Sequence, residues 1–78
     1  MEEHIGMLGH IKNKDDFLEF MQLFLPNVQD SSVRGYLEAL TAWADDMEGY
    51  YKNAGKPVPE NISWDFIATL LYAGSIYE

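Results

Sequence analysis

Apolar residues recur at helical spacing in three stretches of the chain, and the most apolar of these is residues 63–77. Its turns carry two neighbouring apolar stripes, the first formed by Trp64, Ile67, Ala68 and Leu71 and the second by Phe66, Leu70, Ala73 and Tyr77. Ser63 is suited to cap this helix, and Asp65 lies near the positive end of its dipole. Because a helix that is apolar around most of its circumference is normally buried, we expect it to be the central helix of a small bundle.

The other two stretches predict helices over residues 14–25 and 32–52. Asn13 or Lys14 opens the first, and Pro26 ends it because the residue before a proline is displaced from helical geometry. Asp30 or Ser31 caps the second. The apolar stripe of the first helix is Phe17, Phe20, Met21, Phe24 and Leu25, and that of the second is Val33, Tyr36, Leu37, Leu40, Trp43, Ala44, Met47, Tyr50 and Tyr51.

The segments outside these helices are less regular. Gly55 or Asn53 is suited to end the second helix with a positive φ, and the prolines of residues 56–61 favour an extended chain. We expect Val58 and Ile62 to fold back over the far end of the second helix, near Tyr50, Tyr51 and Trp64. Residues 1–12 fit neither period, so a short strand, a turn of helix and a tail over the core all remain open.

These patterns predict an all-α fold, a small three-helix bundle with an irregular N-terminal segment over residues 1–12. A chain of 78 residues has room for one domain, so residues 1–78 are expected to form a single helical domain. The expected core is Trp43, Trp64, Leu40, Phe17, Phe24, Leu71 and Ile67.

Charge narrows the range of partners. Thirteen acidic residues against five basic ones give a formal charge of −8, which weighs against binding nucleic acid or an anionic membrane surface. It is compatible with a basic protein partner, but an acidic surface that only maintains solubility explains it more simply. The chain has no cysteine, no apolar stretch of about 18 residues, and an acidic start at Met1–Glu3. We therefore expect a soluble cytoplasmic protein.

Catalytic and metal-binding motifs are not found. His4 and His10 are six residues apart, in no recognised ligand spacing, and are expected on the surface or in a tail. The serines are better explained as helix caps or helix surface, and Gly6–Gly9 lacks the Lys-Ser/Thr of a phosphate-binding loop. We therefore expect no enzyme activity, no cofactor and no metal.

One acidic group is a candidate for partner binding, because tyrosines beside charges are common at interfaces. It consists of Asp45, Asp46, Glu48, Tyr50 and Tyr51. The alternative is a solvated helix face whose tyrosines pack inward. The functional hypothesis is a small acidic protein-interaction module that binds a basic partner. The alternative is a homo-oligomeric structural protein with no separate ligand.

The last 45 residues or so also resemble a family of small bacterial helical proteins of uncharacterised function. The matching residues are Tyr36–Leu40, Trp43, Asp46–Met47, Tyr50–Tyr51, Asn53, Gly55, Pro57–Pro59, Trp64, Phe66–Ala68, Leu70–Leu71, Ala73 and Ile76–Glu78. The family's Trp-Glu-Asn-like element before the second helix is replaced here by Ser32–Gly35, so a binding site formed by that element is not expected. The resemblance implies a single helical domain, and some members are similar to immunity proteins that neutralise a toxin.

Overall fold

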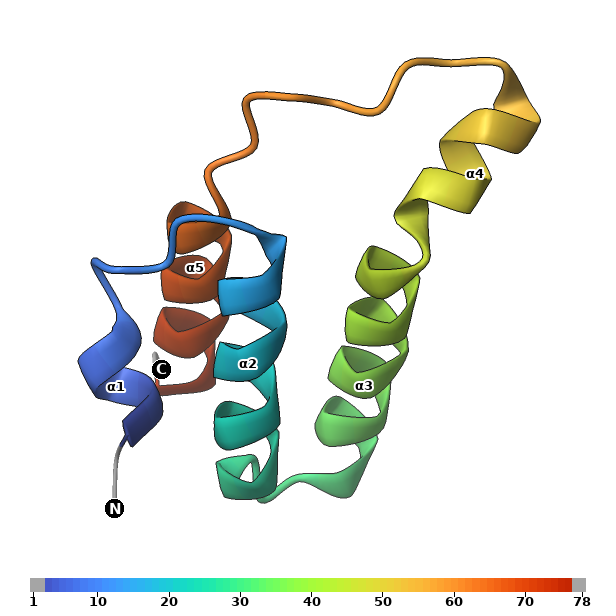
Figure 1. Ribbon diagram of the computed structural model, residues 1–78. Helices are drawn as coiled ribbons and strands as arrows, with labels where there is room; N and C mark the ends of the chain where they lie inside the picture. The colour runs from blue at the N-terminus through green and yellow to red at the C-terminus, as the bar shows by residue number, and fades with distance from the viewer. Residues whose placement is uncertain (1–2, 77–78) are drawn as a thin grey trace.

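The computed structural model describes residues 3–76, and every regular element in that range is a helix (Figure 1). The elements are α1 (Glu3–Met7), α2 (Lys14–Phe24), the 3-10 turn η1 (Leu25–Asn27), α3 (Ser31–Asp45), α4 (Met47–Ala54) and α5 (Trp64–Ile76). The predicted all-α bundle is confirmed.

Helix α2 lies at the centre of the bundle, with α1, α3 and α5 packed around it (Figure 1). Its apolar stripe supplies the three largest fully buried side chains, Phe17, Phe20 and Met21. The prediction that residues 63–77 form the central helix is wrong. Helix α5 packs along α2 with one face and leaves Phe66 63% and Leu70 57% exposed on another. Tyr77, predicted on that second stripe, lies outside the described residues.

The predicted helix ends are confirmed where a local side chain or glycine makes them. The end predicted at Pro26 is wrong in its reason, because Leu25 keeps helical φ and ψ of −56° and −41° and the chain continues through Pro26 as the turn η1. The Asn13 side chain accepts a hydrogen bond from Asp16 N at 2.8 Å, and Asp30 accepts from Ser32 N and Val33 N at 2.9 and 3.2 Å. Ser63 Oγ accepts from Phe66 N at 3.1 Å. Gly55 follows α4 with φ of 70°, a conformation that favours glycine.

The predicted continuous helix over residues 32–52 is wrong, because it breaks at Asp46 into α3 and α4. Asp46 has φ −100° and ψ 10°, outside the usual helical values. In an unbroken helix Gly49 N would donate to Asp45 O, but here it donates to Asp46 O at 3.0 Å. Lys14 Nζ donates to the freed Asp45 carbonyl at 3.0 Å. A side chain from α2 therefore replaces the missing helical bond.

Of the alternatives for residues 1–12, the structure contains the turn of helix, α1. The Asp65 carboxylate on α5 holds the loop after α1, accepting from Gly9 N at 2.7 Å and from Ile11 N at 3.3 Å. The expectation that His4 lies on the surface or in a tail is wrong, since it is only 4% exposed. Its ring lies 5.6–6.1 Å from the rings of Phe20, Phe24 and Tyr72. His10 is exposed.

The predicted core is partly right. Phe17 and Phe24 are buried, and four further predicted residues, Trp64, Ile67, Leu71 and Leu40, are half-buried. Trp43 is wrong as a core residue, because it is 48% exposed. Its stripe on α3 and α4 is wider than the surface that α2 covers, so the residues on its edge remain in contact with solvent.

Candidate functional site

Three aromatic side chains meet where α3 passes into α4. The ring of Tyr50 lies 5.6 Å from that of Trp43 and 5.0 Å from that of Tyr51, and the last pair is nearly perpendicular at 84°. Edge-to-face contacts of this kind hold rings in fixed relative positions. Trp43 and Tyr50 nevertheless remain 48% and 50% exposed, whereas Tyr51 is half-buried. We call Trp43, Tyr50 and Tyr51 the aromatic cluster.

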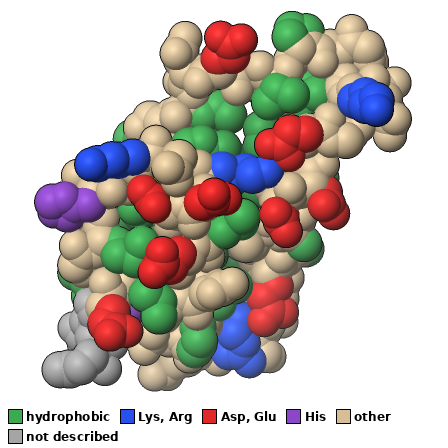
Figure 2. All heavy atoms as spheres, viewed as in Figure 1, with side chains coloured by type: hydrophobic (Ala, Val, Ile, Leu, Met, Phe, Trp, Pro, Cys, Tyr) green, Lys and Arg blue, Asp and Glu red, His purple; other side chains and the backbone are tan. Residues whose placement is uncertain are grey.

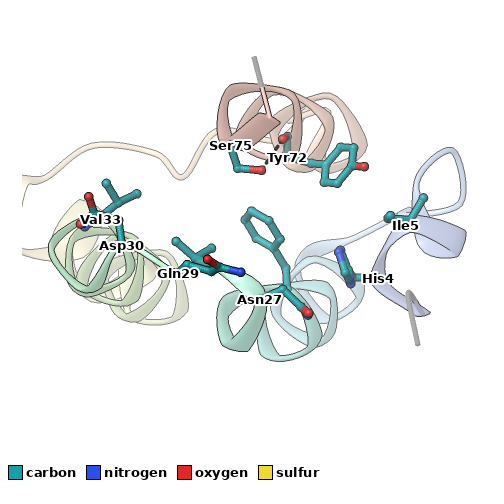
Figure 3. Close-up of a pocket in the computed structure, with 10 residues that line it drawn as sticks. His4, Ile5, Asn27, Gln29, Asp30, Val33, Tyr72 and Ser75 are labelled. Atoms are coloured by element: carbon teal, nitrogen blue, oxygen red, sulfur yellow. Dashed lines mark hydrogen bonds between the residues drawn. The ribbon is translucent and has the colours of Figure 1, made fainter. Parts of the chain in front are cut away.

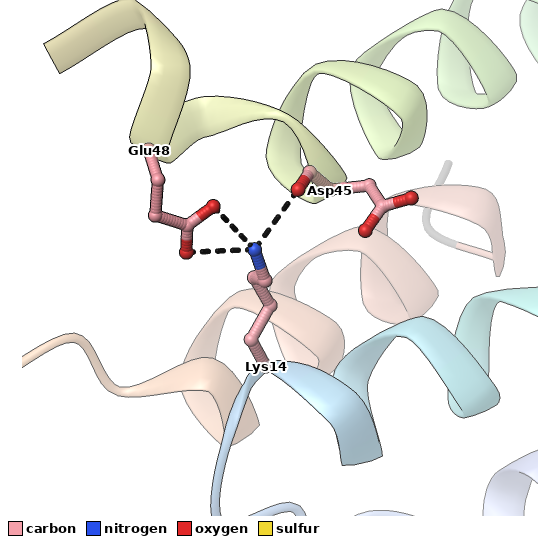
Figure 4. A network of polar contacts seen from close by, with 3 residues as sticks. All are labelled: Lys14, Asp45 and Glu48. Atoms are coloured by element: carbon pink, nitrogen blue, oxygen red, sulfur yellow. Dashed lines mark hydrogen bonds and ion pairs between the residues drawn. The ribbon is translucent and has the colours of Figure 1, made fainter. Parts of the chain in front are cut away.

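Lys14 joins the start of α2 to both sides of the break at Asp46 (Figure 4). Its ammonium lies 2.8 Å from each carboxylate oxygen of Glu48 and 3.0 Å from the backbone carbonyl of Asp45. The hydrogen bond from Lys14 lowers the pKa of Glu48 below its ordinary value of 4.5. Glu48 is therefore already paired within the chain, and the contact fixes the direction in which α4 leaves α3.

The three carboxylates of the predicted site do not meet at one point. Figure 4 shows the Asp45 carboxylate turned away from Lys14, and this residue lines a shallow hollow between α2 and α3. Glu48 and Tyr50 are two positions apart on α4, so at about 100° per residue they point to nearly opposite sides of the helix. Asp46 is exposed and its side chain does not cap α4. The predicted site is thus one acidic flank and one aromatic flank, with Asp46 at the break between them.

The space-filling view shows how charge is distributed on the face formed by α2 and α3 (Figure 2). Acidic side chains are spread over this face, and apolar side chains gather towards α4 at its upper end. Such a distribution creates a negative field next to an apolar area. A partner with positive charge around apolar side chains would match both.

An apolar groove of about 290 Å³ adjoins the aromatic cluster. Trp43 and Tyr51 form part of its wall, Pro59 and Ile62 of the connecting loop close one side, and Trp64 contributes from α5. The expected return of the loop towards Tyr51 and Trp64 is confirmed at Ile62, while Tyr50 faces solvent. No charged residue is among those that line the groove, which suits it to an apolar side chain.

A larger cleft of about 540 Å³ lies at the other end of the bundle, between α1, η1, the start of α3 and α5 (Figure 3). Several of its polar groups already have partners within the chain. Asp30 caps α3, Ser75 Oγ donates to the Tyr72 carbonyl at 2.6 Å, and Asn27 Nδ2 donates to Leu23 O at 3.0 Å. These groups support the local backbone, and the polar lining that remains is Gln29, the Tyr72 hydroxyl and the buried His4 ring, whose Nδ1 has no hydrogen-bond partner among the described residues.

Sequence reasoning missed Trp43 as part of the site, because its position on the apolar stripe favoured burial. One signal was present: Tyr36, Trp43 and Tyr50 follow one another at intervals of seven residues along one edge of that stripe.

Among residues 3–76, no group of three His, Asp or Glu side chains is placed to hold a metal ion. Within the same range, no helix is both long and apolar enough to cross a membrane.

A family model matches residues 13–78, which is most of the chain and all of the candidate site. It describes DUF7660, a family of unknown function, and the chain belongs to this family. No curated protein and no solved structure matches the chain.

Proposed function

We propose that this protein is a small acidic protein-interaction module of the cytoplasm, adaptor- or immunity-like, that binds a basic protein partner. The aromatic cluster is the centre of the proposed binding surface. The observation that carries the proposal is that Trp43 and Tyr50 stay about half exposed although their rings are in contact. Tryptophan and tyrosine are the residues most enriched at the energetic centres of protein interfaces.

The cluster presents its rings on a fixed backbone. Lys14 ties α4 to the start of α2 through Glu48 and the Asp45 carbonyl, so the rings need little ordering when a partner arrives. Preorganisation of this kind lowers the entropic cost of association. Lys14 thus has a positioning role in the proposal, and Glu48 acts on the partner less directly than Asp46 does.

Charge selects the partner in this proposal. Asp46 lies exposed at the break beside the cluster, and the chain carries a formal charge of −8. A basic partner would be attracted over several ångströms and then held by contacts with the rings. The groove beside Tyr51 would receive an apolar side chain of the same partner.

The test is capture from a host lysate on the immobilised full-length protein, followed by washing at low and at high salt. We expect a basic protein that is retained at low salt and released at high salt, because screening weakens exposed charge pairs. Tyr50→Ala is expected to weaken the captured complex by about thirtyfold, the effect typical of a central interface tyrosine. Asp46→Lys is expected to reduce capture as well.

Asp15→Lys is the matched control, since it changes net charge equally at an exposed position on α2 and not at the break between α3 and α4. Capture that falls equally in Asp46→Lys and Asp15→Lys would mean that net charge alone attracts the partner. Capture unchanged by both Tyr50→Ala and Asp46→Lys would show that the cluster is not the binding surface.

A further inference from the structure

Helices α3 and α5 both pack on α2 but not closely on each other. Two separate hollows lie along the cleft between them: Val33 of α3 and Ser75 of α5 line the larger one at one end, and Leu40 and Ile67 line the apolar groove at the other. Three helices in this arrangement fill three positions of a four-helix packing. Within residues 3–76, no helix occupies the fourth.

The two edges of this cleft carry large exposed apolar side chains. On α3 these are Val33 and Tyr36, which are 46% and 70% exposed, and on α5 they are Phe66 and Leu70, which are 63% and 57% exposed. Tyr36 lies three residues after Val33, and Leu70 three residues after Ile67, so these two share a helix edge with a residue of the cleft wall, and Phe66 lies one turn before Leu70 on the exposed side of α5. We call these four residues the α3–α5 edge.

The chemistry of α5 indicates what covers this edge. From Phe66 to Ser75 the helix contains no charged residue, and its only charge, Asp65, is used to hold the loop at Gly9 and Ile11. A basic or acidic partner would therefore find nothing to pair with along α5. An uncharged apolar helix fits the cleft, and α5 is itself such a helix.

We infer that a second copy of this chain covers the α3–α5 edge. In the resulting twofold dimer, α5 of each copy lies against α3 and α5 of the other. A twofold axis brings the same surface of both copies together, so an apolar ridge beside the apolar groove at the Leu40 and Ile67 end of the cleft is self-complementary. The Leu40 and Ile67 end of this cleft is the apolar groove of the proposed function, so the second copy and the partner would share that groove, whereas the edge leaves Tyr50 on α4 uncovered.

The available area is sufficient for such a dimer. At about 200 Å² for a fully exposed side chain of this size, the four residues of the edge present roughly 500 Å² per copy. Two copies then bury about 1,000 Å² before the cleft walls are counted, which is near the lower limit for a specific interface. The acidic side chains that Figure 2 shows are spread over the α2–α3 face. Helix α5 lies behind α2 in that view, so its exposed apolar residues are not part of that acidic face.

The test is sedimentation velocity of the full chain from micromolar to near-millimolar concentration. We expect the wild type to shift from monomer to dimer with little dependence on salt. Leu70→Lys places a charge at the centre of the interface twice per dimer, and is expected to weaken dimerisation by about a hundredfold or more. Phe66→Lys is the second variant, and circular dichroism melts establish that both variants fold.

Tyr50→Lys is the matched control, because it replaces an aromatic residue that is 50% exposed and lies on α4. A dimer lost in Leu70→Lys and Phe66→Lys but kept in Tyr50→Lys supports the inference. A wild type that stays monomeric at near-millimolar concentration overturns it. A dimer that survives both α5 substitutions also overturns it, and loss in Tyr50→Lys alone would place the contact on α4.

Discussion

Replacing Asp65 with alanine tests how the N-terminal segment is held on the bundle. One carboxylate oxygen of Asp65 accepts hydrogen bonds from Gly9 N and Ile11 N, more than fifty residues earlier in the chain. Ile11 is only 5% exposed and belongs to the core, and Gly9 has φ of 92°, a turn that depends on glycine. The carboxylate thus fixes the loop that delivers α1, and with it His4, to α2 and α5.

The cost of Asp65→Ala follows from these contacts. Hydrogen bonds to a charged group contribute about 1.5–3 kcal/mol, and the exposed Gly9 N–H can exchange its bond for one with water. Loss of a negative charge in the first turn of α5 adds about 0.3–1 kcal/mol. We expect the free energy of unfolding to fall by about 2 kcal/mol, a large part of the stability of a domain this size.

Urea melts of the full chain measure this loss. Asp65→Asn keeps an acceptor oxygen without the charge and is expected to cost about half as much. Asp46→Ala removes an exposed carboxylate that caps no helix, and is expected to stay within about 0.5 kcal/mol of the wild type. Amide hydrogen exchange adds a local readout, since the Ile11 amide should exchange faster in Asp65→Ala. A cost below about 0.5 kcal/mol with unchanged exchange at Ile11 would refute the proposed role of Asp65.

Three further predictions concern other contacts. Lys14 lowers the pKa of Glu48 in the folded state. The contact between Lys14 and Glu48 therefore stabilises the fold at pH values above the unfolded-state pKa of 4.5, and this stabilisation is lost as pH falls through the lower folded-state pKa. In urea melts, the free energy of unfolding of the wild type should therefore exceed that of Glu48→Gln at neutral pH, and the two values should converge in acid. An equal difference at both pH values would count against the contact. Trp64→Ala should lower the free energy of unfolding by about 2–3 kcal/mol, less than for a fully buried tryptophan, because this half-buried ring packs 5.2 Å from that of Phe17. A loss below about 1 kcal/mol in urea melts would show that Trp64 does not contribute to the core. His4→Leu should leave the free energy of unfolding unchanged or raise it by up to about 1 kcal/mol, because it removes a buried Nδ1 that has no hydrogen-bond partner among the described residues. Thermal melts measure this, and a clear fall in melting temperature would contradict the prediction.

The helix ends could be predicted from the sequence because the contacts that make them are local. Asn13, Asp30 and Ser63 each bond to backbone two or three residues ahead. Gly55 acts through its own φ. Such signals need no knowledge of the fold: the sequence predicted Ser63 alone, and it gave Asn13, Asp30 and Gly55 each as one of two candidates.

The break at Asp46 could not be predicted in the same way. The apolar spacing continues from Ala44 through Met47 to Tyr51 as if the helix were unbroken. What stabilises the break is Lys14, which comes thirty-one residues before Asp45 in the chain and reaches its carbonyl only in the folded bundle. The candidate site depends on this distant contact, because the break separates the acidic flank at Glu48 from the aromatic flank at Tyr50.

The central helix was misassigned for a different reason. A strongly apolar sequence indicates how much surface a helix must bury, but not which neighbours are present to cover it. Helix α2 is covered by α1, α3 and α5, whereas α5 buries one face against α2 and keeps Phe66 and Leu70 exposed. The rule that an apolar helix is covered on most sides applies to the assembled protein, not to one chain. The inferred dimer would cover the apolar surface of α5 that its own chain leaves exposed, and this surface is visible only in the folded chain.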